Sequence, residues 1–161
     1  MITAGRELWV EWVAMFDPNF NTNSGQSSYG TDYKFFFVHS LPDGSGRAEV
    51  KVGTYGSGHH FSVNVPGNLE DSWTFDTPSS VWDGQWHVYR MYLKPSSAVG
   101  VADGVFQVWV DGVLYANKTG VAYRATAFDV LTPGANNNQG PTQAASVWWG
   151  RIRAWNSNPG W

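Results

Sequence analysis

Residues 102–114 read ADGVFQVWVDGVL, and this stretch decides the fold class. From Val105 to Val110, apolar side chains alternate along the chain with residues suited to the opposite face, which is the period-two pattern of a strand with one buried face. The Asp111-Gly112 pair that follows is a strong hairpin signal, and a second strand is expected from Val113 to Lys118. The stretch therefore predicts an antiparallel β-hairpin.

Short β-rich runs of the same kind continue outward from this hairpin to both ends of the chain. Gly, Pro, Asn and Ser separate them, and long polar loops are expected over residues 19–31 and 133–142. No long run has helical periodicity. The pattern predicts one all-β domain over residues 1–161, a two-sheet antiparallel jelly-roll β-sandwich. Its further strands are expected at Glu7–Phe16, Tyr33–His39, Arg47–Tyr55, His60–Val65, Trp73–Phe75, Trp86–Lys94, Val121–Arg124 and Ala145–Trp155.

The composition excludes several classes of protein and favours a binding surface. The net charge is −3 and no basic stripe is visible, which argues against nucleic acid as the partner. No apolar run approaches the roughly 20 residues needed to span a membrane, and residues 1–6 lack the apolar core of a signal peptide. Ten Trp, seven Tyr and nine Phe are many for a core of this size, so several are expected on the surface. The alternative is that strands simply favour aromatic residues.

Strand alternation assigns the faces. The core is expected to take Leu8, Val10, Trp12, Ala14 and Phe16 from the first strand, then Phe106, Val108 and Val110, and finally Trp148, Ile152 and Ala154 from the last strand. The opposite face is expected to collect aromatic, Arg, Gln and Glu residues. These are Trp9, Glu11, Arg90, Tyr92, Gln107, Trp109, Trp149, Arg151 and Arg153.

Two kinds of partner fit that outward set. Aromatic rings stack on the C–H faces of sugar rings, while Arg, Gln and Glu hydrogen-bond hydroxyl groups and Arg binds carboxylates or sulfates bidentately. Aromatic and Arg enrichment is equally typical of protein interfaces, so another subunit is the alternative partner.

Several stretches resemble one superfamily: residues 7–12, 33–36, 83–87, 92–94 and 102–114, together with the closing strand through Ala154. The chain resembles the concanavalin A-like lectin/glucanase superfamily, in the branch with polysaccharide-lyase-like and laminin G-like domains. The resemblance implies a jelly roll with a sugar-binding concave face. It also implies one or two strands before residue 7, where only six residues stand, so the chain is expected to be either a fragment or a minimal jelly roll. A missing strand would leave a sheet edge that a partner could complete. By analogy with laminin G-like domains, Asp103, Asp111 and Asp129 are candidate calcium ligands.

The glucanase motif of this superfamily is missing, and its lyase motifs are matched only loosely. No Glu-x-Asp-x-x-Glu occurs, and Glu7 and Glu11 stand four residues apart, about 13 Å along a strand, too far for a retaining pair. One Gln-x-His triplet occurs, at Gln85-Trp86-His87. Arg151-Ile152-Arg153 and Tyr92 loosely match a lyase, and His39 is a possible base. We therefore predict no catalytic residue and no required cofactor.

Three functions remain open. The first is a non-catalytic carbohydrate-binding module, extracellular or on a virion surface. The second is a structural virion protein, a capsid decoration or tail appendage that assembles with other subunits through the aromatic face or an incomplete edge. The third is a divergent polysaccharide lyase.

Overall fold

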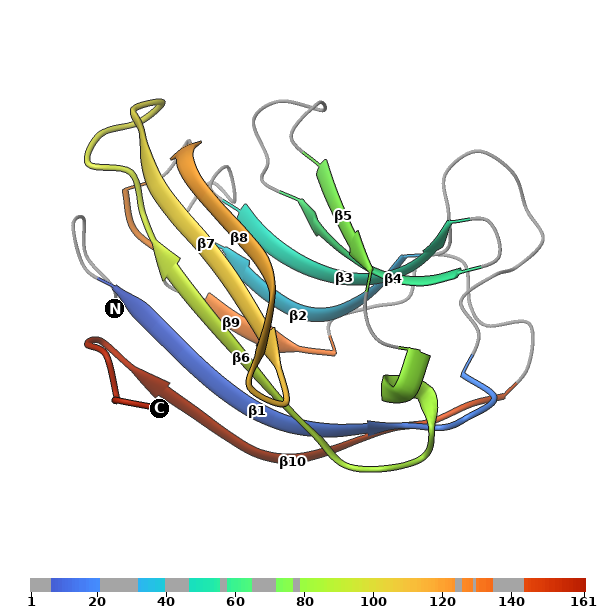
Figure 1. The fold of residues 1–161 in the computed structure, drawn as a ribbon. Coiled ribbons are helices and arrows are strands. Elements are labelled where there is room, and N and C mark those ends of the chain that lie inside the picture. The colour runs from blue at the N-terminus through green and yellow to red at the C-terminus, as the bar shows by residue number, and fades with distance from the viewer. Residues whose placement is uncertain are drawn as a thin grey trace.

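A computed structural model gives the fold (Figure 1), and its backbone is described for residues 7–20, 32–39, 47–55, 58–64, 72–76, 79–123, 126–128, 130–134 and 144–161. Side chains are described for residues 7–20, 35–39, 81–123, 126–128, 130–134 and 144–161. The elements in chain order are β1 (Leu8–Phe16), β2 (Asp32–His39), β3 (Arg47–Tyr55), β4 (Gly58–Asn64), β5 (Ser72–Asp76), the 3-10 turn η1 (Ser79–Trp82), β6 (His87–Lys94), β7 (Ala102–Val110), β8 (Val113–Ala122), β9 (Val130–Pro133) and β10 (Val147–Trp155).

The strands form two five-stranded antiparallel sheets that pack face to face, as in a jelly-roll sandwich. The outer sheet has the strand order β10-β1-β6-β7-β8, and the inner sheet has the order β5-β4-β3-β2-β9. β1 is flanked on both sides, so the edges of the outer sheet are β10 and β8. Within the described residues, no helix is long and apolar enough to cross a membrane.

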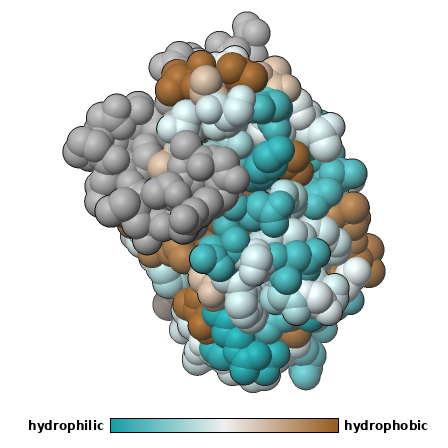
Figure 2. Space-filling model, turned by 90° about the vertical axis from the view of Figure 1, so that its left-hand side faces the viewer, coloured by the Kyte–Doolittle hydropathy of each residue, from teal (hydrophilic) through white to brown (hydrophobic). Residues whose placement is uncertain are grey.

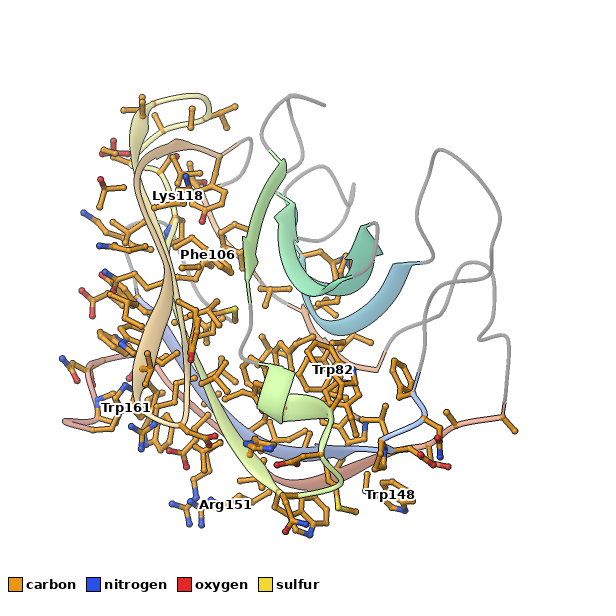
Figure 3. All side chains as sticks on the ribbon, turned by 45° about the vertical axis from the view of Figure 1, so that its right-hand side comes forward. Trp82, Phe106, Lys118, Trp148, Arg151 and Trp161 are labelled. Carbon is orange, nitrogen blue, oxygen red and sulfur yellow. The ribbon has the colours of Figure 1, made fainter. Side chains whose placement is uncertain are left out.

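The core lies between the sheets and follows the predicted alternation on β1 and β7. All five of the predicted core residues of β1 are buried, as are those of β7. Trp12 is at the centre of this core, stacked between Phe36 on β2 and Tyr89 on β6 with ring centroids 4.4 and 5.6 Å away. Figure 3 shows Phe106 and Trp82 pointing into the same layer. This large aromatic core fixes how the two sheets sit on each other.

The predicted hairpin is confirmed in detail. Asp111 and Gly112 have φ angles of 49° and 81°, the left-handed pair that a two-residue turn between twisted strands requires. β8 runs on to Ala122, so it absorbs the separate strand expected at Val121–Arg124. β9 is a four-residue strand that ends at Pro133, and it is too short for the sequence pattern to have predicted it.

The outward face of the outer sheet is convex, not concave as predicted. In Figure 1, β1 and β10 bow around the inner sheet, so their concave side faces the core and their convex side faces away from it. The inner sheet bows in the same sense, and its outward face is therefore the concave one.

Candidate functional site

The register of the outer sheet aligns one residue from every strand on its convex face. Trp9 is opposite Trp155 on one side and Tyr92 on the other, and the pairing continues through Gln107 to Asn117. Residues directly opposite each other in a sheet share a face, so these five form one line across it. We call this line the Trp9 row.

Ring stacking and hydrogen bonds connect the side chains of the Trp9 row. The Trp9 ring stacks on Tyr92, with centroids 4.2 Å apart, and the Trp109 ring is also stacked relative to Trp9, with centroids 6.4 Å apart. Glu7 accepts hydrogen bonds from Trp9 Nε1 at 2.9 Å and from the Tyr92 hydroxyl at 3.1 Å. Burial, with the hydrogen bond and charge of Glu7, raises the pKa of Tyr92 to about 12. Trp9 is only 9% exposed, so it supports the surface more than it forms it.

A second line lies beside the first, two residues further along β1. Glu11 is opposite Arg153 and Arg90, and Arg90 is in turn opposite Trp109, which pairs with Leu114. We call this line the Glu11 row. It brings cations, a carboxylate and a half-buried tryptophan onto the same face as the Trp9 row.

Glu11 organises the arginines. It is 5% exposed and accepts hydrogen bonds from Arg90 Nε at 3.0 Å and Arg151 Nη2 at 3.2 Å. Burial alone would raise the pKa of Glu11, but the hydrogen bonds and charges of Arg90 and Arg151 outweigh it and hold this pKa below its usual value. Arg153 is exposed and makes no ion pair with any described residue, so its guanidinium is available to a ligand.

Trp161 also belongs to this face, although the strand pattern did not predict it. Its ring packs edge-on against Trp9 and Trp155, with centroids 5.6 and 5.2 Å away, and the Arg90 guanidinium is 5.0 Å from its centre. Figure 3 shows Trp161 and Arg151 on the outside of the outer sheet. Trp161 lies six residues beyond the last strand, in a polar turn, so periodicity gives no signal for its position.

Trp149 is not part of the face, and its predicted position is wrong. The register between β1 and β10 shifts between Trp12 and Ala14, which marks a bulge in β10. An extra residue reverses the alternation beyond it. Trp149 therefore turns inward and packs on Phe35, with ring centroids 4.9 Å apart.

Three residues expected in the core are exposed instead. They are Trp148, at 43%, Ile152, at 41%, and Ala154. Trp148 lies beyond the bulge and shares the outer face with its partner Met15. Ile152 and Ala154 do pair with core residues of β1, but they stand on the edge strand of the outer sheet.

The described part of the chain holds no group of three or more His, Cys, Asp or Glu residues that could bind a metal ion. Two of the candidate calcium ligands have other roles: Asp103 accepts a hydrogen bond from the Ser97 amide, and Asp111 binds the Val88 amide and His87. Asp129 lies outside the described residues.

The exposed groups of the two rows can bind sugar hydroxyls and ring faces. Gln107 donates to Asn117 at 2.8 Å, which leaves further amide donors and acceptors of both side chains at the surface. Figure 2 looks onto the side where β7 and β8 lie, and hydrophilic and near-neutral residues cover most of its described surface. The Trp109 ring, the amides and Arg153 together supply a flat apolar surface beside hydrogen-bond donors.

The sequence matches no protein-family model and no curated protein. Several solved structures share the fold. An alginate lyase mutant in complex with alginate trisaccharide matches with a TM-score of 0.70 and 12% identity, over 97% of this chain and 73% of that one. An endo-β-1,4-glucuronan lyase from the fungus Trichoderma reesei matches with a TM-score of 0.57 and 12% identity, over 98% and 71%. The globular domain of T. cruzi calreticulin matches at 0.53 and 10%, over 98% and 66%.

These likenesses show the fold predicted from the sequence: the chain folds as a two-sheet jelly-roll β-sandwich. At such identities they carry no residue-level correspondence.

Proposed function

We propose that this concanavalin A-like jelly roll is an extracellular module that binds a polysaccharide, without cleaving it, through the Trp9 and Glu11 rows. Trp109 provides the stacking surface. Gln107 and Asn117 bind hydroxyl groups, and Arg153 binds a hydroxyl or an acidic group of the sugar. Trp9, Tyr92, Glu11 and Arg90 hold these residues in place.

One observation carries the proposal: two aligned rows place a half-buried tryptophan on the same face as amide and guanidinium donors, and the side chains that support them are already paired. A site held by internal hydrogen bonds and ring stacking loses little side-chain freedom when a ligand binds. The lyases of the same fold act on uronate polymers by name, and one was solved with an alginate trisaccharide, which supports a polysaccharide as the ligand class.

The test is binding to an array of neutral, uronate and sulfated glycans, followed by titration calorimetry on the best ligand. Removing the stacking surface in Trp109→Ala should weaken binding about tenfold, and Trp109→Phe should restore much of it because a flat ring remains. Val99→Ala, at an exposed loop position, is the matched control and should bind like the original protein. Unchanged affinity in Trp109→Ala would refute this site.

The inner sheet offers a second candidate, a polysaccharide lyase. Its concave face carries Phe37 and His39, whose rings are 4.6 Å apart, and the register places Arg47 opposite His39. Elimination from a uronate needs a base for the proton beside the carboxylate and a cation for the charge that develops there. His39 and Arg47 are the residue types for these two tasks.

The same glycans separate the two functions. Unsaturated uronate products absorb in the ultraviolet, so incubation with alginate and glucuronan reports cleavage directly. We expect no rise in absorbance. A rise in absorbance that disappears in His39→Ala would mean that the protein is a lyase whose site lies on the inner sheet.

A further inference from the structure

Two tryptophans on the convex face lie outside both rows and are among the most exposed apolar side chains described. Trp86 is 51% exposed and Trp148 is 43% exposed. Trp9, by contrast, contacts three other aromatic rings. Neither Trp86 nor Trp148 makes a ring contact within the described part of the chain, so about half of each side chain is left at the surface and no other aromatic ring covers it.

The register puts these tryptophans in line. Trp148 is opposite Met15 on β1, and His87, which is opposite Ala14, is directly preceded by Trp86. Because alternate residues point to opposite faces and His87 is buried, Trp86 points outward beside Met15. This line crosses three neighbouring strand positions through Trp148, Met15 and Trp86. Two strand spacings therefore separate the backbones of the two tryptophans, which is about 9 to 10 Å. We call this line the Met15 row.

The surface next to the Met15 row is apolar. Val13 and Val88 are opposite each other, two residues along their strands from Met15 and Trp86, and both are half-buried. Gly150 completes this floor, since a Cβ there would come within 3.3 Å of the Val13 Cβ. The two tryptophans therefore flank a shallow surface without side-chain hydrogen-bonding groups.

Charged groups border this surface but are engaged elsewhere. Asp83 and Asp111 both contact His87, and Arg151, which follows Gly150, is paired with Glu11. Among the described residues no unpaired cation lies beside it and acidic side chains stand at its border, so the Met15 row suits an uncharged ligand better than an anionic one.

The small size of this surface favours a glycan over a protein as the uncharged ligand. These few residues are far fewer than the roughly 20 to 30 per side of a stable protein interface. An extended, equatorially linked glycan chain presents the same ring face at every second sugar, at a spacing close to that of two tryptophans two strands apart. We infer that the Met15 row is a second binding site, for a neutral β-linked polysaccharide, in addition to the site formed by the Trp9 and Glu11 rows and independent of it.

Depletion from solution by microcrystalline cellulose, and separately by chitin, tests this inference. The original protein should be retained by at least one of them. Trp86→Ala and Trp148→Ala should each lower the partition coefficient about tenfold, and Trp86→Tyr should keep most of it. Val99→Ala is the control, and thermal unfolding verifies that each variant is folded.

Three results would overturn the inference. They are no retention of the original protein on either solid, full retention of the Trp86→Ala/Trp148→Ala double variant, and light scattering that finds a dimer which the double variant dissociates. The last result would mean that a second copy of the chain occupies the surface. Failure here leaves the soluble-glycan array unaffected, so the two proposals fail separately.

Discussion

His87 is a buried side chain whose two carboxylate contacts require the positively charged, doubly protonated ring. Its Nδ1 lies 2.6 Å from Asp111 Oδ2, and its Nε2 lies 3.1 Å from Asp83 Oδ1. Carboxylates only accept hydrogen bonds, so both contacts are satisfied only by the doubly protonated ring. Burial by itself lowers the pKa of His87, but the hydrogen bonds and charges of Asp111 and Asp83 outweigh it and raise this pKa above 6.5.

This raised pKa predicts how stability depends on pH. The folded state binds the His87 proton more tightly than the unfolded chain, so the added stability is complete below the unfolded pKa near 6.5 and is lost as the pH rises through the folded pKa. The urea concentration at the midpoint of unfolding should therefore decrease as the pH is raised from about 6 to about 9. His87→Gln should be about 1 kcal/mol less stable at the lower pH and should not show this fall.

His39→Gln is the control, because His39 makes no ion pair with any described residue. It should keep the pH dependence of the original protein. A midpoint for the original protein that stays level across this range would contradict the charged state of His87.

At the scale of the strand, β10 separates two neighbouring tryptophans that the sequence alone cannot tell apart. Trp149 packs on Phe35 in the core, whereas Trp148 is 43% exposed. Trp149→Ala should lower the free energy of unfolding by about 2 to 3 kcal/mol because it leaves a partial cavity. Trp148→Ala should change it by no more than about 0.5 kcal/mol. Urea unfolding measures both, and equal losses would mean that the bulge is misplaced.

The same strand explains how far sequence patterns could go. Alternation assigned β1 and β7 correctly because no bulge interrupts the residues concerned, and it placed Trp9, Glu11 and Trp109 on one face. It failed for Trp148 and Trp149 because one extra residue in β10 reverses the alternation beyond the bulge. Gly150 lies at this bulge, and a glycine inside a strand is the signal that alternation alone does not use. β9 was missed because a four-residue strand is too short for a periodic signal.

At the scale of the molecule, the sequence-based prediction was wrong about the curvature of the sheet that carries the aromatic face. Alternation tells which residues share a face but not which way a sheet bends, because bending depends on how the two sheets twist and pack. The aromatic face was therefore found, yet it belongs to the convex side (Figure 1). Trp161 was missed for a related reason, since only the folded chain brings the end of the sequence over Trp9.

The two-layer architecture makes the location of binding decidable by one experiment. The facing sheets of a sandwich are about 10 Å apart and the layer between them is filled, so a glycan on one outer surface cannot touch the other. Titrating a glycan that binds in solution into isotopically labelled protein should shift the backbone amide signals of β1, β6 and β7, around Trp9, Arg90 and Trp109. Those of β2 and β3 should stay in place.

Trp109→Ala should reduce these shifts at a fixed glycan concentration, because it removes the stacking surface without touching the core. Shifts concentrated around His39 and Arg47 would instead put the ligand on the concave face, where cleavage chemistry was the competing candidate. The convex site would then have to be given up even if Trp109→Ala weakened binding, since a change on one sheet can act on the other through the aromatic core, where Trp12 and Tyr89 pack on Phe36 and Phe35.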